Sequence, residues 1–129
     1  MPIVKQLSVV VENRPGVLAE VCSELAKKAV NIQAVMVADM RGFGPLRLVV
    51  NNEEVATRVF DTMGLKYSQE QVLAVRLSDK PGALGRVTRK LAEHDINIEY
   101  AYGTIEKGAP RALVILAVSD LKKAVSLTK

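Results

Sequence analysis

In the first half of the chain, the spacing between apolar residues changes several times. The run "QLSVVVE" (6–12) is rich in β-branched residues and predicts a strand. After Pro15, apolar residues recur at three- and four-residue steps from Leu18 to Ala29, which predicts an amphipathic helix. The remaining predicted elements are a hairpin of strands over 31–39 and 45–50 around "RGFG" (41–44), a helix over 53–63 and a short strand over 65–68. This order is βαββαβ.

The second half repeats the first. Shifted by 66 residues, the sequence aligns with itself without a gap, so that Pro15-Gly16 meet Pro81-Gly82 and Asn31-Ile32 meet Asn97-Ile98. The two helices align their apolar residues, which are predicted to be core: Leu18, Val21 and Leu25 with Leu84, Val87 and Leu91. Further predicted elements are strands over 71–78, 96–105 and 112–118 and helices over 83–94 and 120–127. We therefore predict two copies of one unit, residues 1–69 and 70–129.

Each unit has the pattern of an α+β fold. Two helices on one face of an antiparallel sheet give a ferredoxin-like βαββαβ unit. The second unit ends soon after its last helix, so a counterpart of residues 64–70 is missing and its fourth strand is doubtful. Open sheet edges are rarely left uncovered, so either the sheet is one strand short or another segment completes it. The N-terminal run from Ile3 to Val11 is one candidate, within the chain or across to a second chain.

The two Pro-Gly dipeptides have a specific chemical consequence. Proline suits the first turn of a helix, and glycine leaves the backbone amides uncovered. Such a helix end carries a partial positive charge and favours an anion such as an α-carboxylate. Asn13 and Asp79, just before the turns, have side-chain oxygens that accept from an ammonium group. The alternative is purely structural, because Asn and Asp are also common helix N-caps.

Together, "NRPGVL" with "NI" and "DKPGAL" with "NI" resemble the ACT domain, and the resemblance covers nearly the whole chain. It implies a stand-alone tandem ACT protein that binds an amino acid or a related metabolite where units meet, between the Pro-Gly loop of one and the Asn-Ile strand of another. Carried over to this sequence, the implied ligand-binding residues are Asn13, Pro15, Gly16, Val17, Leu18, Asn31, Ile32, Asp79, Pro81, Gly82, Ala83, Leu84, Asn97 and Ile98, and the residues themselves add Tyr100 and Tyr102 as candidates for a pocket wall.

Two pairs in that set have structural alternatives. Asn31 and Asn97 are also typical turn residues that lead into a strand. Tyr100 and Tyr102 alternate along one strand and point to one face, where their counterparts are Ala34 and Met36. They either line a pocket or cover helices or an interface.

Composition excludes several functions. With one His (His94, expected to be exposed) and one Cys (Cys22, expected to be a buried, inert thiol), a zinc site of the usual kind is excluded. No nucleophile, base and orienting group stand together, so we predict no enzyme activity and no cofactor. No run of aromatics suits RNA, and no apolar stretch is long enough to span a membrane. The N-terminus is a poor signal peptide, so we expect a cytoplasmic protein. The net charge of +4 could help to bind an acidic partner, but the Lys and Arg residues are scattered among Glu and Asp, which favours a solvated surface.

These observations favour an amino-acid sensor that signals to a partner enzyme or protein. The alternatives are a regulatory subunit that docks on a catalytic subunit with weak or no ligand binding, and a structural remnant. Two thin cores and an incomplete sheet also predict a homodimer.

Overall fold

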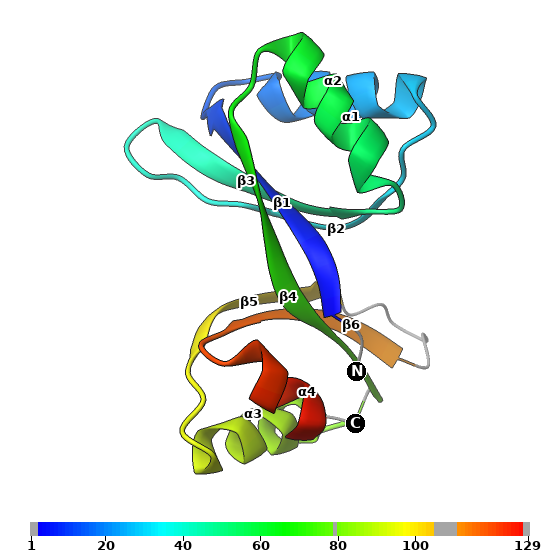
Figure 1. The fold of residues 1–129 in the computed structure, drawn as a ribbon. Coiled ribbons are helices and arrows are strands. Elements are labelled where there is room, and N and C mark those ends of the chain that lie inside the picture. The colour runs from blue at the N-terminus through cyan, green and yellow to red at the C-terminus, as the bar shows by residue number, and fades with distance from the viewer. Residues whose placement is uncertain (1–2, 79, 105–110, 128–129) are drawn as a thin grey trace. The chain divides into compact units, whose positions relative to one another are not determined.

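The computed structural model describes residues 3–78, 80–104 and 111–127 (Figure 1). In chain order its elements are β1 (Ile3–Glu12), α1 (Val17–Lys27), β2 (Ile32–Val37), β3 (Phe43–Val50), α2 (Glu53–Met63), β4 (Tyr67–Ser78), α3 (Ala83–Glu93), β5 (Ile98–Thr104), β6 (Arg111–Val118) and α4 (Leu121–Leu127). Hydrogen bonds order the strands β2-β3-β1-β4-β6-β5. The predicted α+β fold with antiparallel sheets is confirmed.

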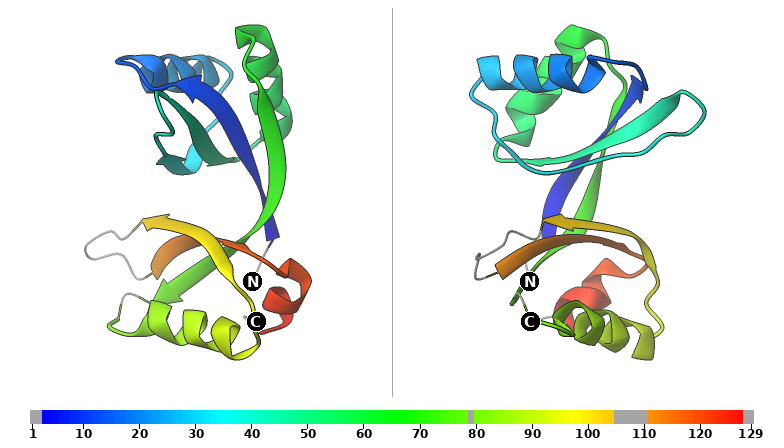
Figure 2. Two further views of the ribbon diagram at one scale, coloured as in Figure 1. Left: turned by 90° about the vertical axis from the view of Figure 1, so that its left-hand side faces the viewer. Right: turned by 180° about the vertical axis from the view of Figure 1, so that it is seen from behind.

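The chain forms two compact units. The first unit is Lys5–Glu70, and the second is Gln71–Lys129 together with Met1–Val4. In each unit two helices cover one face of the sheet, α1 and α2 in the first and α3 and α4 in the second (Figures 1 and 2). Leu7, Leu25 and Phe60 are fully buried in the first core, and Leu73 and Leu91 in the second.

The doubtful fourth strand of the second unit comes from the N-terminus. Strand β1 begins at Ile3, earlier than predicted, and Ile3 and Val4 belong to the second unit, where β1 is the neighbour of β4. Strand β4 is one continuous strand instead of the two predicted over 65–68 and 71–78. Its first residues, Tyr67–Glu70, belong to the first unit. The additional strand of the second unit is therefore supplied by the same chain, which was one of the two alternatives, and not by a second chain.

The internal repeat is not free of gaps. In β1 and β3 Leu7 pairs with Leu48, and in β4 and β6 Leu73 pairs with Leu116. The first strands are thus related by 66 residues but the third strands by 68. Two additional residues therefore lie between the start of β5 and the start of β6, and the predicted gap-free alignment is wrong beyond that point.

The buried stripe of α1 and α3 is displaced from the predicted one. Leu18 and Leu84 are 39% and 45% exposed, so their assignment to the core is wrong. The residues one position earlier, Val17 and Ala83, pack on the cores instead. The reason is the four-residue spacing of Val17, Val21 and Leu25 and of Ala83, Val87 and Leu91, which is one face of a helix. Cys22 lies beside this face and is only half-buried.

The β2–β3 hairpin is confirmed, with a tight turn at its tip. Arg41 and Gly42 both have positive φ, 61° and 85°, and Met40 N–H donates to the Phe43 carbonyl at 2.6 Å. Positive φ at both central residues is the type I′ turn that matches the twist of a hairpin.

Candidate functional site

The two Pro-Gly loops have the same backbone geometry. Gly16 and Gly82 adopt left-handed conformations with φ of 88° and 87°, which glycine reaches without strain. In the first loop Val17 N–H donates to the Arg14 carbonyl at 3.3 Å, and in the second Ala83 N–H donates to the Lys80 carbonyl at 3.2 Å. The two sequence copies therefore build two copies of one local structure.

The helices that follow these loops begin without a side-chain cap. Gly16 and Gly82 are the N-cap residues of α1 and α3, and no side chain caps either helix in the described part of the chain. The other two helices are capped: Asn52 accepts from the Val55 amide and Asp120 from the Lys123 amide, both at 3.1 Å. The uncapped ends are thus specific to the Pro-Gly loops.

The predicted alternative, in which Asn13 caps α1, is wrong because the chain turns at Gly16 before the helix begins. Asn13 is exposed, and its own amide donates to the Gly42 carbonyl at 2.7 Å. No acceptor within the described residues faces the amides of Leu18 and Ala19 in the first turn of α1. Asp79, the counterpart of Asn13, lies outside the described residues. Pro15 and Pro81 are exposed beside their glycines.

A cavity of about 290 Å³ lies beside the first loop. Val17, Val21, Met63 and Leu65 contribute apolar side chains. The same cavity is lined by three charged residues, Glu12, Arg14 and Glu20. An apolar interior with charged groups at fixed positions is the usual composition of a small-molecule site.

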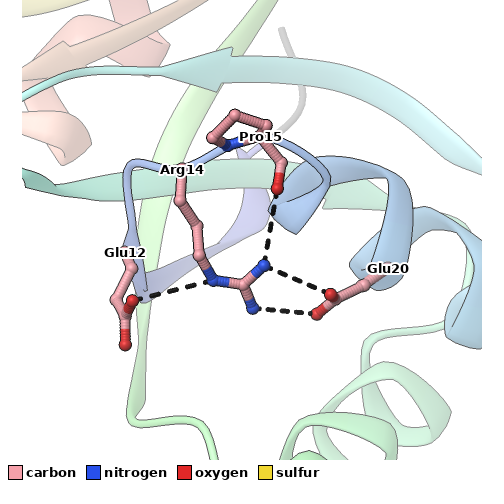
Figure 3. A network of polar contacts seen from close by, with 4 residues as sticks. All are labelled: Glu12, Arg14, Pro15 and Glu20. Carbon is pink, nitrogen blue, oxygen red and sulfur yellow. Dashed lines mark hydrogen bonds and ion pairs between the residues drawn. The ribbon is translucent and has the colours of Figure 1, made fainter.

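The charged residues form one network (Figure 3). Arg14 binds Glu20 with both terminal nitrogens, at 3.2 and 3.1 Å, while its Nε lies 3.6 Å from Glu12. The hydrogen bond to Glu20, followed by the charge of that carboxylate, raises the pKa of Arg14 above its ordinary value. The network presents one guanidinium and two carboxylates, the charges complementary to a carboxylate and an ammonium group. Sequence analysis missed this network, although opposite charges on both sides of a Pro-Gly turn were a visible signal.

The Asn-Ile pairs begin the strands in the same way in both units. Asn31 N–H donates to the Asn51 side chain at 2.8 Å, and Asn97 N–H donates to the Ser119 hydroxyl at 2.9 Å. Both asparagines are exposed, while Ile32 and Ile98 pack against the cores. The backbone of each asparagine therefore has a structural role, which leaves the exposed side chain available for other contacts.

Tyr100 and Tyr102 share one face of β5, since they pair with Ala117 and Ile115 of β6 without a register shift between them. The neighbouring Leu116, which is in the core under the helices, pairs with Ala101. The tyrosines therefore lie on the sheet face away from α3 and α4, and the prediction that they cover helices is wrong. A register shift between Ile98 and Tyr100 places Ile98 on the helix face and both tyrosines on the other.

Two further features bear on the class of site. Within the described ranges, no group of three His, Cys, Asp or Glu side chains is placed to hold a metal ion. None of the helices described is long and apolar enough to cross a membrane.

The family model for the ACT domain pair matches residues 2–126, so the chain belongs to the ACT domain pair family. Among solved structures it is similar to protein BT0572 from Bacteroides thetaiotaomicron, with 30% identity, coverage of 97% of this chain and 85% of that chain, and a TM-score of 0.90. It shares its fold with the ligand-free regulatory subunit of aspartate kinase from Thermus thermophilus, with 14% identity, coverage of 98% and 95%, and a TM-score of 0.71. No curated protein sequence matches the chain significantly.

Proposed function

We propose that this protein is a non-catalytic, cytoplasmic regulatory protein that binds an amino acid and signals to a partner protein, with residues 1–69 and 70–129 each supplying most of one ACT domain. One observation carries the proposal: as far as the described residues show, α1 and α3 begin uncapped at the Pro-Gly loops, whereas α2 and α4 are capped by Asn52 and Asp120. Uncapped amides at a helix N-terminus suit a carboxylate.

The chemistry of the loop residues suits an amino acid. Its α-carboxylate would accept hydrogen bonds from the first amides of α1 or α3, and its ammonium group would be bound by Asn13 in the first unit or Asp79 in the second. Exposed Leu18 and Leu84, next to these amides, offer apolar contacts to the ligand side chain. Asn31, Asn97, Tyr100 and Tyr102 would come from the strands of a neighbouring unit.

Family membership supports the regulatory part of the proposal, as does the fold shared with a protein described as a regulatory subunit of aspartate kinase. The rival is a docking subunit in which ligand binding is weak or lost. The Arg14–Glu20 pair favours this rival in the first unit, because a ligand carboxylate would have to compete with Glu20 for the guanidinium.

We expect one of the twenty amino acids to raise the thermal stability of the pure protein. A ligand at 100 times its dissociation constant adds about 2.7 kcal/mol to the free energy of unfolding, which a thermal-shift screen detects. The same amino acid in the D-configuration is the control, because it cannot place carboxylate, ammonium and side chain on the same groups. A screen without any shift would favour the docking rival.

We also expect a homodimer. The ligand site of the proposal needs a loop and a strand from different units, and a two-fold pair of chains is the commonest way to bring such surfaces together. Light scattering at micromolar concentration measures the mass directly. The mass of a single chain, unchanged when the ligand from the screen is added, would contradict this expectation.

A further inference from the structure

The positive charge of the protein belongs to one half of the sequence. Residues 1–70 contain eight basic and eight acidic side chains, whereas residues 71–129 contain ten basic and six acidic ones. The whole net charge of +4 therefore lies in the second half.

Much of this difference in charge lies in the helices α1 and α3. They occupy equivalent positions 66 residues apart, with the same length and the same loop before them. At three matched positions α1 has Glu20, Ser23 and Glu24, whereas α3 has Arg86, Arg89 and Lys90. The three cations of α3 are exposed and spaced i, i+3 and i+4, so they lie on one flank of the helix. We call Arg86, Arg89 and Lys90 the basic flank.

The cations of the two units differ in whether they have ion-pair partners. In the first unit Arg14, Lys27 and Arg58 pair with Glu20, Glu24 and Glu54, all four or fewer ångströms away. No residue of the basic flank forms an ion pair within the described part of the chain. Lys123 of α4 adds a further cation beside the end of α3, where its Nζ donates to the His94 carbonyl at 2.9 Å. Among the described residues, the flank is therefore a positive surface without ion-pair partners.

Arg86, the first cation of the basic flank, does not serve the stability of its helix. The first turn of α3 has no acidic residue, and Arg86 stands where α1 has Glu20. Arg86, near the helix N-terminus, opposes the helix dipole, and it is repelled by Arg89 and Lys90 on the same flank, whereas Lys90 in the last turn is the one cation that the dipole favours. A role outside the fold explains these charges better than stability does.

We propose that the basic flank is the docking surface for an acidic segment of a partner protein. Helix α3 has 11 residues and spans about 16 Å, which suits a short segment with several carboxylates. A protein is favoured over nucleic acid because neither α3 nor α4 carries an aromatic residue for stacking on bases. The inference rests on the partner-signalling part of the proposed function and is independent of which ligand binds.

The test is a graft from one helix to the other. In the triple variant Arg86→Glu, Arg89→Ser, Lys90→Glu, α3 receives the residues that α1 carries in the same fold. Fluorescence anisotropy with a labelled oligo-glutamate peptide measures the affinity. We expect the natural protein to bind the peptide with an affinity that falls as salt is added, and the graft to bind at least about tenfold more weakly.

A matched control separates a local surface from overall charge. Lys27→Glu, Lys28→Glu, Lys66→Ser changes three exposed residues of the first unit and lowers the formal charge by the same five units. An equal loss in this control, or no loss in the graft, would overturn the docking surface. Equal or tighter binding of a DNA duplex under the same conditions would overturn the protein partner.

Two readouts keep the result interpretable. Circular dichroism checks that the graft is folded, and Arg89→Ser alone is the milder variant if it is not, with a smaller loss expected. Failure of the amino-acid screen does not affect this test. If the peptide binds through the basic flank but no amino acid has an effect, the docking surface is supported. Only the ligand-binding part of the proposed function is then contradicted.

Discussion

Replacing Phe60 by alanine is expected to lower the free energy of unfolding of the first unit by about 3–5 kcal/mol. The side chain is fully buried in the core under α1 and α2, and its ring packs against that of Tyr67 at a centroid distance of 5.8 Å. Truncation removes this apolar contact and leaves a cavity, because the surrounding strands and helices relax only in part. Urea unfolding followed by circular dichroism measures the loss.

The chain contains one other phenylalanine, which is the natural control. Phe43, at the start of β3, is 54% exposed, so Phe43→Ala is expected to change the free energy of unfolding by no more than about 0.5 kcal/mol. Comparable losses in the two variants would show that Phe60 is not the centre of the core described above. Separate transitions for the two units would show, in addition, which unit Phe60 supports.

The fold could be predicted from sequence because local and global signals agree in this chain. Apolar residues repeat every two positions in the strands and every three or four in the helices, and the duplication provided each signal twice. The spacing of apolar residues could not settle which face of each helix is buried. Leu18 and Val17 both fit an apolar stripe, and only packing against the sheet decided that Val17 is inside.

Long-range pairing was the second limit. The sequence showed that the second unit lacked a strand and offered the run from Ile3 to Val11 as one candidate, but it left open whether that run acts within the chain or across to a second chain. Which strands pair depends on which backbone groups meet in space, and the pattern of apolar residues carries no such information. The start of β1 at Ile3 and the continuous β4 therefore emerged only from the structure.

The candidate site was predicted as a motif, but its polar contacts were not. The sequence predicted a glycine with uncovered amides at each Pro-Gly turn, and the positive φ found at both glycines is a conformation that glycine adopts freely. The network of Arg14 with Glu12 and Glu20 depends on side-chain directions at the end of β1 and the first turn of α1. Such directions are set by the three-dimensional path of the turn, which the spacing of residues alone leaves open.

The Pro-Gly loops themselves provide the sharpest test of the proposed ligand site. Gly16→Val and Gly82→Val are each expected to weaken binding of the amino acid found in the screen by about a hundredfold or more in the site that they alter. A branched side chain at φ near 88° strains the turn and shields the first amides of the helix. A Cβ atom at Gly16 meets no atom within 4 Å, so strain and shielding, not a clash, cause the loss in Gly16→Val, whereas a Cβ at Gly82 would lie 3.1 Å from the flexible Arg86 Nη1.

Gly64→Val separates binding from folding. Gly64 also has positive φ, 71°, and open space around its Cβ position, but it ends α2 instead of preceding a helix. All three variants are expected to lose about 1–3 kcal/mol of stability from backbone strain, while only the two loop variants lose affinity. Isothermal titration measures the affinity and thermal unfolding the stability. Unchanged affinity in both Gly16→Val and Gly82→Val would show that the uncapped helix ends are not the ligand site.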